Sequence, residues 1–259
     1  GFGAGLCGIM RSWERADGAE VRWYDEVDST NDVAKFWAQS GAIEGSVVCA
    51  EVQSAGRGRR GAVWVCPAAE GLAFSVILRP TMSRALWPRI ALITGLAVAQ
   101  SLEYFGIAAE LKWPNDVLVA GKKICGVLVE AVGDAVIVGV GINVGVREFP
   151  DELRKIATSV WLESGREIER DELLEEVVKR TVHQVAGIEG EFSELLDAWR
   201  QRCALTGKWV SCLIAEQPFV GIVRGVSDAG ELLLDIDGEL RALLQADQIR
   251  VIANSRSGD

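Results

Sequence analysis

Three arginines, Arg57, Arg59 and Arg60, stand within four positions of a glycine-rich segment that reads GRGRRG. Glycine lets the backbone come close to a ligand, and a guanidinium binds carboxylate or phosphate oxygens with paired hydrogen bonds. Such a segment suits a reaction that brings a carboxylate and a triphosphate together, because these two anions would otherwise repel one another. The segment therefore predicts a loop that closes over an anionic ligand.

The glycines of this segment, Gly56, Gly58 and Gly61, also match the G-x-G-x-x-G spacing of dinucleotide-binding proteins. That fingerprint requires a helix directly after the glycines, but the following residues include Pro67 and lack helical apolar spacing. An RNA-binding patch is disfavoured too, because 27 basic residues face 37 acidic ones, a net charge of −10. A solvated charged turn stays as the alternative.

A second group of candidate residues lies in KWPNDVLVAGKKICGVLVE. Lys112 ends a predicted strand, and the proline two residues later favours a turn that presents Asn115 and Asp116. Lys123 follows Asp116 by seven residues, across a predicted hairpin turn at Gly121. We therefore expect the side chains of Asp116 and Lys123 to face one another. The alternative is a structural hairpin that carries a surface ion pair.

A third segment, GVGINV, combines two glycines with an amide side chain. Gly139 and Gly141 leave room for a ligand against a strand, and Asn143 offers amide contacts. A glycine-rich strand can equally be a bulge or a packing site. The single histidine, His183, falls within a predicted helix and is interpreted as structural. No Cys/His spacing typical of a metal site occurs, so no metal held by the protein is predicted.

Short alternating runs of strand and helix must position these residues. The segment from Ala109 to Val144 consists of β-rich runs broken by turn residues, which predicts an antiparallel meander. After Gly207 only short strands with glycine and aspartate turns follow, which predicts a separate small β-barrel. The other predicted strands are Glu20–Val27, GSVVCAEV and Leu72–Leu78, and the predicted helices are Asn31–Ser40, Leu86–Phe105, Arg170–Ile188 and Glu191–Ala204.

The predicted fold class is α+β, with a mixed, largely antiparallel sheet flanked by helices and followed by the small barrel. Residues 1–19 are expected to be a leader that is poorly ordered or foreign to the native chain, 20–206 the main domain and 207–254 the barrel. In the helix Asn31–Ser40, the apolar residues Val33, Phe36 and Trp37 are expected on one face.

Composition points to a cytoplasmic protein. Six cysteines lack any C-x-x-C pattern and lie mostly in apolar runs, as expected of buried free thiols in a reducing compartment. The apolar N-terminal run has no basic lead-in, and no run reaches the ~18 apolar residues of a membrane span, so neither a signal peptide nor a span is predicted. The acidic balance argues against binding to nucleic acid or anionic membranes.

Five motifs occur together in one order. They are DSTN (Asp28–Asn31), EVQSAGRGRRGAVW (Glu51–Trp64), KWPNDV (Lys112–Val117), GKKICGVLVE (Gly121–Glu130) and GVGINV (Gly139–Val144). In this order and at these separations the chain resembles the biotin–protein ligases over roughly residues 20–250. Each motif alone is modest evidence, whereas all five in sequence are highly specific. The resemblance implies a catalytic domain like that of biotin ligases and class II aminoacyl-tRNA synthetases, and an SH3-like C-terminal barrel.

The resemblance also implies a reaction in two steps. The carboxylate of biotin attacks the α-phosphorus of Mg-ATP, which gives biotinyl-5′-adenylate and pyrophosphate. The ε-amine of a lysine in the biotin-carrier domain of a carboxylase then attacks the adenylate and releases AMP. Neither step needs an enzyme nucleophile, so positioning and positive charge are expected to supply the catalysis. Biotin and ATP are thus the expected small molecules, and Mg²⁺ is expected to bind through the ATP phosphates.

Site residues follow from the resemblance, motif by motif. The expected biotin contacts are Ser29, Thr30, Asn31, Gln53, Arg57, Gly58, Arg59, Lys123 and Gly126. The expected ATP and adenylate contacts are Arg57, Arg59, Arg60, Trp64, Asn115, Lys123, Gly141 and Asn143. Catalytic roles are expected for four residues: Lys123 on the biotin carboxylate and α-phosphate, Arg57 in the closing loop, Asp116 in orienting or deprotonating the acceptor lysine, and Lys112 in tuning phosphate charge.

Two alternatives stay open at this point. A lipoate– or octanoate–protein ligase shares the catalytic fold, but Gln53 and the DSTN motif favour biotin. A non-catalytic biotin-binding module is the other. Ala62 stands where the loop of the family commonly carries arginine, which leaves one phosphate contact without its usual residue. About 20 residues precede the first matching strand, so we expect an enzyme without a DNA-reading domain, acting as a monomer or homodimer and binding neither nucleic acid nor membrane.

Overall fold

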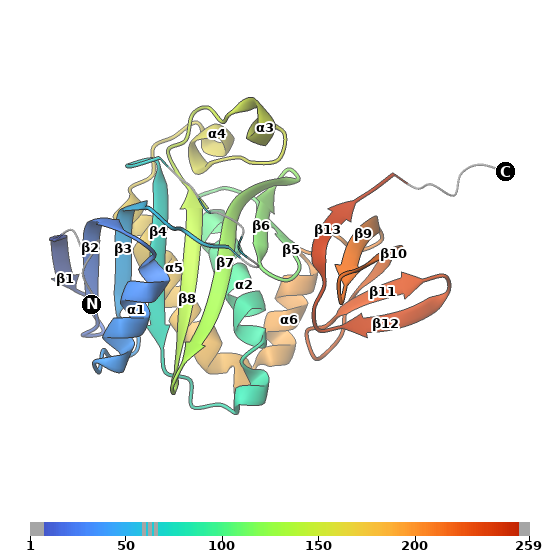
Figure 1. Ribbon diagram of the computed structural model, residues 1–259, viewed down its shortest axis with the longest axis horizontal. Helices are drawn as coiled ribbons and strands as arrows, with labels where there is room; N and C mark the ends of the chain where they lie inside the picture. The colour runs from blue at the N-terminus through green and yellow to red at the C-terminus, as the bar shows by residue number, and fades with distance from the viewer. Residues whose placement is uncertain (1–7, 59–60, 62–63, 65–66, 254–259) are drawn as a thin grey trace.

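Two β-sheets lie side by side in the computed structural model, which describes residues 8–58, 61, 64 and 67–253 (Figure 1). The larger sheet has eight strands, and helices cover both of its faces. Its strands, in spatial order, are β1 (Ile9–Glu14), β2 (Glu20–Val27), β3 (Val47–Gln53), β4 (Gly71–Leu78), β8 (Ala135–Asn143), β7 (Lys122–Val132), β6 (Asp116–Val119) and β5 (Glu110–Lys112).

Neighbouring strands of this sheet are antiparallel except for β2 and β3, which are parallel. A parallel pair requires a crossover connection, and helix α1 (Thr30–Gln39) provides it. Strands β5 to β8 form the antiparallel meander predicted from residues 109–144. The mixed, largely antiparallel sheet expected from the sequence is therefore confirmed.

Helix α1 packs on one face of the sheet, and α2, α5 and α6 pack on the other (Figure 1). The buried positions of α1 include Ala34 and Ala38, while Phe36 is 71% exposed. Val33 and Trp37 are half-buried and pack against the core, so the expected apolar face was wrong for Phe36. The small alanines let the helix backbone approach the sheet closely.

Helices α2, α5 and α6 agree with the predicted ones to within a few residues at their ends. The bounds are η2 (Arg84–Leu86), α2 (Arg89–Tyr104), α3 (Asp151–Arg154), α4 (Val160–Ser164), α5 (Arg170–Ala186), η3 (Gly187–Glu189) and α6 (Phe192–Arg200). The helix predicted from Leu86 begins later because Pro88 occupies its N-cap, and Leu86 ends a separate 3-10 turn. The short helices α3 and α4 were not predicted.

The smaller sheet is antiparallel throughout and follows Gly207, as the change in sequence pattern predicts. Its spatial order is β12 (Glu239–Leu243), β11 (Leu232–Ile236), β10 (Gln217–Val226), β9 (Trp209–Ile214) and β13 (Asp247–Val251). Trp113 Nε1 donates to the carbonyl of Gly230 at 3.0 Å, and one apolar core includes buried residues of both sheets. The smaller sheet is thus docked firmly against the β5–β6 edge of the larger one.

The N-terminal segment corrects one expectation. Residues 9–14 form the edge strand β1 rather than a poorly ordered leader. Trp13 stacks on Trp23 of β2 with ring centroids 6.3 Å apart, and Arg11 forms a bidentate ion pair with Asp171 of α5. These contacts order a segment that local propensity alone does not, so the main sheet begins before residue 20.

A partly buried ion pair ties α5 to the strands that carry the glycine-arginine segment. Both terminal nitrogens of Arg170 donate to the carboxylate of Glu51 at 2.9 Å, and Trp23 Nε1 and the Ala69 amide donate to it as well. Burial by itself raises the pKa of Glu51, but the hydrogen bonds and charge of Arg170 outweigh burial and hold that pKa below its usual range. The cluster anchors both ends of the segment between β3 and β4.

Replacing Arg170 with methionine leaves this carboxylate without its main partner and is expected to lower the free energy of unfolding by about 2–4 kcal/mol. The pair contributes above the pKa of unfolded glutamate, ~4.3, and the contribution is lost as pH falls through the lower folded value. Urea unfolding at pH 7 and pH 4 measures both effects. The double variant Arg170→Met/Glu51→Gln should recover part of the lost unfolding free energy. An equal loss in the single and the double variant would contradict the assignment of this ion pair.

Candidate active site

A cavity of about 180 Å³ opens at the centre of the large sheet, beside the start of α1 and the glycine-arginine segment. The residues around it come from α1, β3, β7, β8 and the two connections that the sequence singled out. The lining residues are Ser29, Thr30, Asn31, Gln53, Arg57, Gly58, Trp64, Asn115, Lys123, Gly126, Val127, Leu128, Gly139, Val140 and Gly141. Residues separated by more than 100 positions in the chain thus meet around one space.

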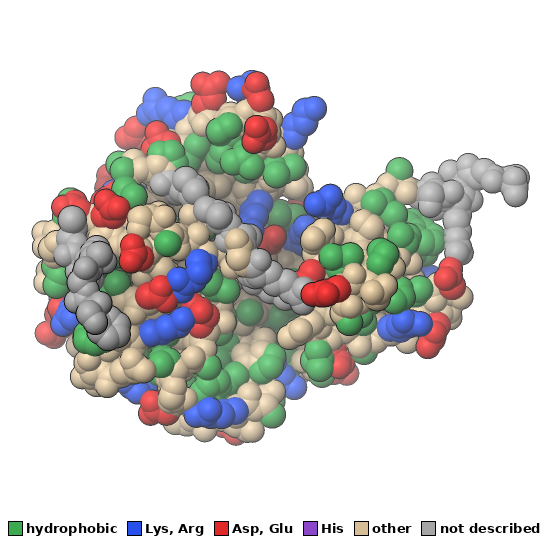
Figure 2. Space-filling model, in the orientation of Figure 1, with side chains coloured by type: hydrophobic (Ala, Val, Ile, Leu, Met, Phe, Trp, Pro, Cys, Tyr) green, Lys and Arg blue, Asp and Glu red, His purple; other side chains and the backbone are tan. Residues whose placement is uncertain are grey.

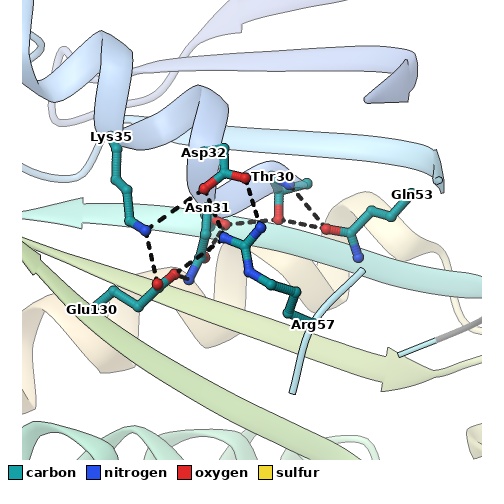
Figure 3. A network of polar contacts seen from close by, with 8 residues as sticks. Thr30, Asn31, Asp32, Lys35, Gln53, Arg57 and Glu130 are labelled. Carbon is teal, nitrogen blue, oxygen red and sulfur yellow. Dashed lines mark hydrogen bonds and ion pairs between the residues drawn. The ribbon is translucent and has the colours of Figure 1, made fainter. Parts of the chain in front are cut away.

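A polar network fixes the α1 end of this cavity (Figure 3). The amide and hydroxyl of Thr30 lie 2.9 and 3.2 Å from Gln53 Oε1, and Ser75 Oγ lies 2.7 Å from the same hydroxyl. Asn31 Nδ2 donates to Glu130 at 2.6 Å, while its oxygen lies 2.6 Å from Ser75 Oγ. Because each group already has a partner, the network holds these side chains in one arrangement around the cavity.

The glycines of the cavity have a different role from the one expected. A side chain at Gly139 would collide with Asn31, and one at Gly141 would collide with the indole of Trp64. The space over these glycines is therefore filled by protein side chains, whereas the sequence suggested room for a ligand. A side chain at Gly56 would strike the carbonyl of Trp64, whose amide donates to the Gly56 carbonyl at 3.0 Å. Glycine is required at position 56 because the two ends of the segment approach each other there and leave no room for a side chain.

Lys123 reaches the cavity because of an irregularity in β7. The register shifts between Val117 and Leu118, which leaves Ile124 as an extra residue in β7, a β-bulge. The bulge brings Lys123 to the face of Gly126, where its Nζ lies 3.2 Å from the position that a Cβ of Gly126 would take. The amide and carbonyl of Lys123 also bond to the backbone of residues 156 and 158, which fixes the start of the strand.

The predicted pairing across this hairpin is confirmed. Lys123 Nζ lies 2.7 Å from Asp116 Oδ1, and the two side chains are 39% and 23% exposed. The same Nζ lies 5.9 Å from the centroid of the Trp64 ring. Positive charge is therefore held at the boundary of the cavity, close to an aromatic face.

A second cavity, of about 550 Å³, lies on the other side of Asn115, between the β5–β6 hairpin and the C-terminal sheet. Lysine and arginine side chains gather over the hollow where the two sheets meet (Figure 2). Among the lining residues are Lys112, Asp116 and Arg250. Burial, the largest cause, lowers the pKa of Lys112; Asp116 opposes that shift, and the charges of Lys123 and Arg250 add to it.

Most of the predicted site residues meet around the first cavity, and the exceptions are specific. Lys112 and Asp116 line the second cavity, beside Lys123. Asn143 is buried, its Nδ2 donates to the Thr158 carbonyl at 3.0 Å, and it does not line the first cavity. Arg59 and Arg60 lie outside the described residues.

Sequence reasoning missed the polar residues that support the site from behind. These are Asp32, Lys35, Ser75 and Glu130. Asp32 adjoins the DSTN motif and Glu130 ends GKKICGVLVE, so both lay beside segments already singled out. Ser75 sits in an apolar strand with no such signal.

The described residues hold neither a cluster of metal-ligand side chains nor a membrane-spanning helix. No three histidine, cysteine or acidic side chains in this part of the chain come together in a way that would hold a metal ion. None of its helices is long and apolar enough to cross a membrane.

Comparison with known proteins places this geometry in context. Residues 23–146 match the model of the Biotin/lipoate A/B protein ligase family. The chain is 33% identical to the bifunctional ligase/repressor BirA of Bacillus spizizenii over 243 residues, which cover 89% of this chain and 74% of that protein. It is 32% identical to the biotin–[acetyl-CoA-carboxylase] ligase of Mycobacterium tuberculosis over 254 residues, covering 95% and 92% of the two chains.

The fold agrees with these sequence matches. The structure of the biotin protein ligase from Aquifex aeolicus in complex with biotin and ATP superposes with a TM-score of 0.81 at 34% identity, covering 90% of this chain and 99% of that one. Both the main domain and the C-terminal sheet lie within so extensive a match. The chain therefore belongs to the biotin protein ligase family, within the broader group of biotin and lipoate protein ligases.

Proposed function

We propose that this chain joins biotin to ATP and transfers the biotinyl group to a lysine of a biotin-carrier domain. In the first step a biotin carboxylate oxygen bonds to the α-phosphorus of ATP, and the bond from that phosphorus to the bridging oxygen breaks to release pyrophosphate. In the second, the lysine nitrogen bonds to the biotinyl carbonyl, loses a proton, and AMP departs. The observation that carries this proposal is the meeting of Lys123, the start of α1 and the glycine-arginine segment around one cavity.

Biotin is assigned to the cavity beside α1. Its ureido ring would take the hydrogen-bonding end formed by Ser29, Thr30 and Gln53, with Asn31 held behind it by Glu130. Its carboxylate would then lie toward Lys123, at the opposite boundary. Gly58 closes another side of the cavity, and Gly126 offers only backbone under the Lys123 stem.

The nucleotide is assigned to the side where the two cavities adjoin. Asn115 lines both cavities, and Trp64 lies against Gly141 beside Lys123, so these residues are placed to meet the adenylate. Lys123 would neutralise the carboxylate and the α-phosphate together. We propose phosphate contacts for Arg59 and Arg60 from their position in the segment, and for Asn143 a role in holding the Thr158 carbonyl at the edge of the site.

Asp116 is assigned to the second step. Its carboxylate lines the larger cavity, through which an acceptor lysine would approach the adenylate. A lysine amine, with a pKa of ~10.4, is mostly protonated at neutral pH, so a nearby carboxylate would orient it and accept its proton. Mg²⁺ fits such a site when it is held mainly by phosphate oxygens, and two described carboxylates, Asp116 and Asp247, line the second cavity.

The wider assignments follow from the same function. The acceptor is proposed to be the biotin-carrier domain of a carboxylase. The described cysteines, Cys49, Cys125, Cys203 and Cys212, are free thiols, which supports a cytoplasmic location.

A lipoate–protein ligase is the second candidate, because the matching family model covers both acids. The hydrogen-bonding end at Thr30 and Gln53 favours biotin, since an acyl chain has no polar ring to pair with it.

Calorimetry with biotin and with lipoate tests the substrate directly. Biotin should bind the wild-type chain, and the affinity for lipoate should be lower by about 100-fold or more, because lipoate leaves buried polar groups unpaired. A non-hydrolysable ATP analogue should then bind the biotin complex. Preference for lipoate would overturn the proposed acid, and binding of biotin without turnover would favour a non-catalytic module.

Replacing Lys123 with alanine should slow adenylate formation by about 100-fold or more, because it removes the positive charge nearest the reacting oxygens. Pyrophosphate release measures the rate. Lys122→Ala, one residue away on the same strand and outside both cavity linings, is the matched control and should change the rate little. Melting temperatures of both variants show whether each is folded, and a normal rate in folded Lys123→Ala would remove this residue from the active site.

The lowered pKa of Lys112 predicts a limit on activity at alkaline pH. Its charge is lost as pH rises through a value below the ~10.4 of an ordinary lysine, and adenylate formation should fall with it. Arginine stays protonated over this range, so Lys112→Arg should move the alkaline limb of the pH–rate profile upward. The same alkaline limb in both proteins would show that a group other than Lys112 sets it.

A further inference from the structure

Arg57 lines the first cavity, and its guanidinium is held by a carboxylate of the protein. Nη1 and Nη2 donate to the two carboxylate oxygens of Asp32 at 2.7 and 2.6 Å, a bidentate pair (Figure 3). Asp32 lies in the first turn of α1, directly after the DSTN motif. A paired, charge-assisted contact of this kind has a well-defined geometry as well as a favourable energy.

A second ion pair surrounds the first. Lys35 Nζ lies 2.7 Å from Glu130 Oε1 and 3.6 Å from Asp32 Oδ1, and Glu130 Oε2 lies 3.7 Å from Arg57 Nη2. Two cations thus face two anions, and the charges balance within the cluster. Hydrogen bonds from Arg57 hold the pKa of Asp32 below its usual range although burial opposes them, so both members of the pair are charged at neutral pH.

The two partners belong to different kinds of structure. Asp32 is carried by a helix whose alanines pack on the sheet, so its position is fixed. Arg57 follows the point where the glycine-arginine segment leaves β3, where the amides of Ser54 and Ala55 donate to residues 27 and 28 and the Gly56 carbonyl accepts from Trp64. The ion pair adds to these backbone bonds a direct side-chain link from Arg57 to α1.

We propose that Asp32 is a positioning residue that latches Arg57, and with it the described backbone of residues 56–58, beside the cavity. Arg57 then acts through its attachment to α1, and it does not offer its guanidinium to the biotin carboxylate or to a phosphate. Lys123 is left as the described cation that faces the reacting oxygens. The ligand in this statement rests on the proposed function, whereas the Arg57–Asp32 pair rests on the structure alone.

Ligand retention is the first test. Asp32→Asn should release biotinyl-adenylate about three- to tenfold faster than wild type, the range expected for a partly exposed bidentate pair. Asp32→Glu should restore part of the retention. The control is Asp134→Asn, which removes the exposed partner of Arg79 away from the cavity and should change nothing. Unchanged release from Asp32→Asn would overturn the proposal.

Exchanging the two charges separates a latch from a direct anion contact. Arg57→Asp alone should release the adenylate quickly, and the double variant Asp32→Arg/Arg57→Asp should recover retention to within about threefold of wild type, because an ion pair has been rebuilt. A direct contact predicts the opposite, since an aspartate at position 57 repels a phosphate whatever stands at position 32. A double variant no better than Arg57→Asp would overturn the latch.

Trypsin cleavage without ligand keeps the result independent of the reaction. A guanidinium held by Asp32 is unavailable to the protease, so cleavage after Arg57, followed by mass spectrometry, should be about three- to tenfold faster in Asp32→Asn and near wild type in the double variant. Equal cleavage in all three proteins would overturn the latch. If wild-type protein forms no biotinyl-adenylate but shows this cleavage pattern, the proposed function fails and the latch stands.

Discussion

A carboxylate and a triphosphate repel each other, so a site that joins them depends on positive charge held where they meet. We propose Lys123 for that place: it lines the first cavity and lies 2.7 Å from Asp116, which lines the second. A β-bulge turns its side chain to the face of Gly126, and backbone bonds to residues 156 and 158 hold the strand on which it stands. The ion pair keeps the charge in one position, and the surrounding architecture exists to keep that pair in place.

Positive charge is concentrated near the cavities and is not spread over the whole protein surface. With a net charge of −10, the protein surface as a whole does not attract anions, so the basic residues near the cavities act locally. Two of them pair with carboxylates of the protein, Arg57 with Asp32 and Lys123 with Asp116. These pairs fix where the charges lie and so give the site shape as well as charge.

Both sheets contribute to the site. The biotin-side cavity is built by the large sheet and α1, whereas the larger cavity is closed by the segment that enters β13 of the C-terminal sheet. The Trp113–Gly230 hydrogen bond and the shared apolar core hold the two sheets together at this point. A second domain that merely accompanied the first would need neither contact, so we interpret the C-terminal sheet as a wall of the catalytic site.

Local sequence was sufficient for most of the elements and for one ion pair of the candidate site. Hydrophobic periodicity and turn residues predicted β2, the meander of β5 to β8 and the separate C-terminal strands, because such patterns reflect which face of an element is buried. Spacing across one short hairpin was enough to pair Asp116 with Lys123. Contacts between distant segments could not be predicted from local sequence. Strand β1 is ordered by Trp23 and Asp171, and the glycines of β8 accommodate the side chains of Asn31 and Trp64. Those outcomes depend on which side chains the folded chain brings together, and a linear sequence holds no record of these distances.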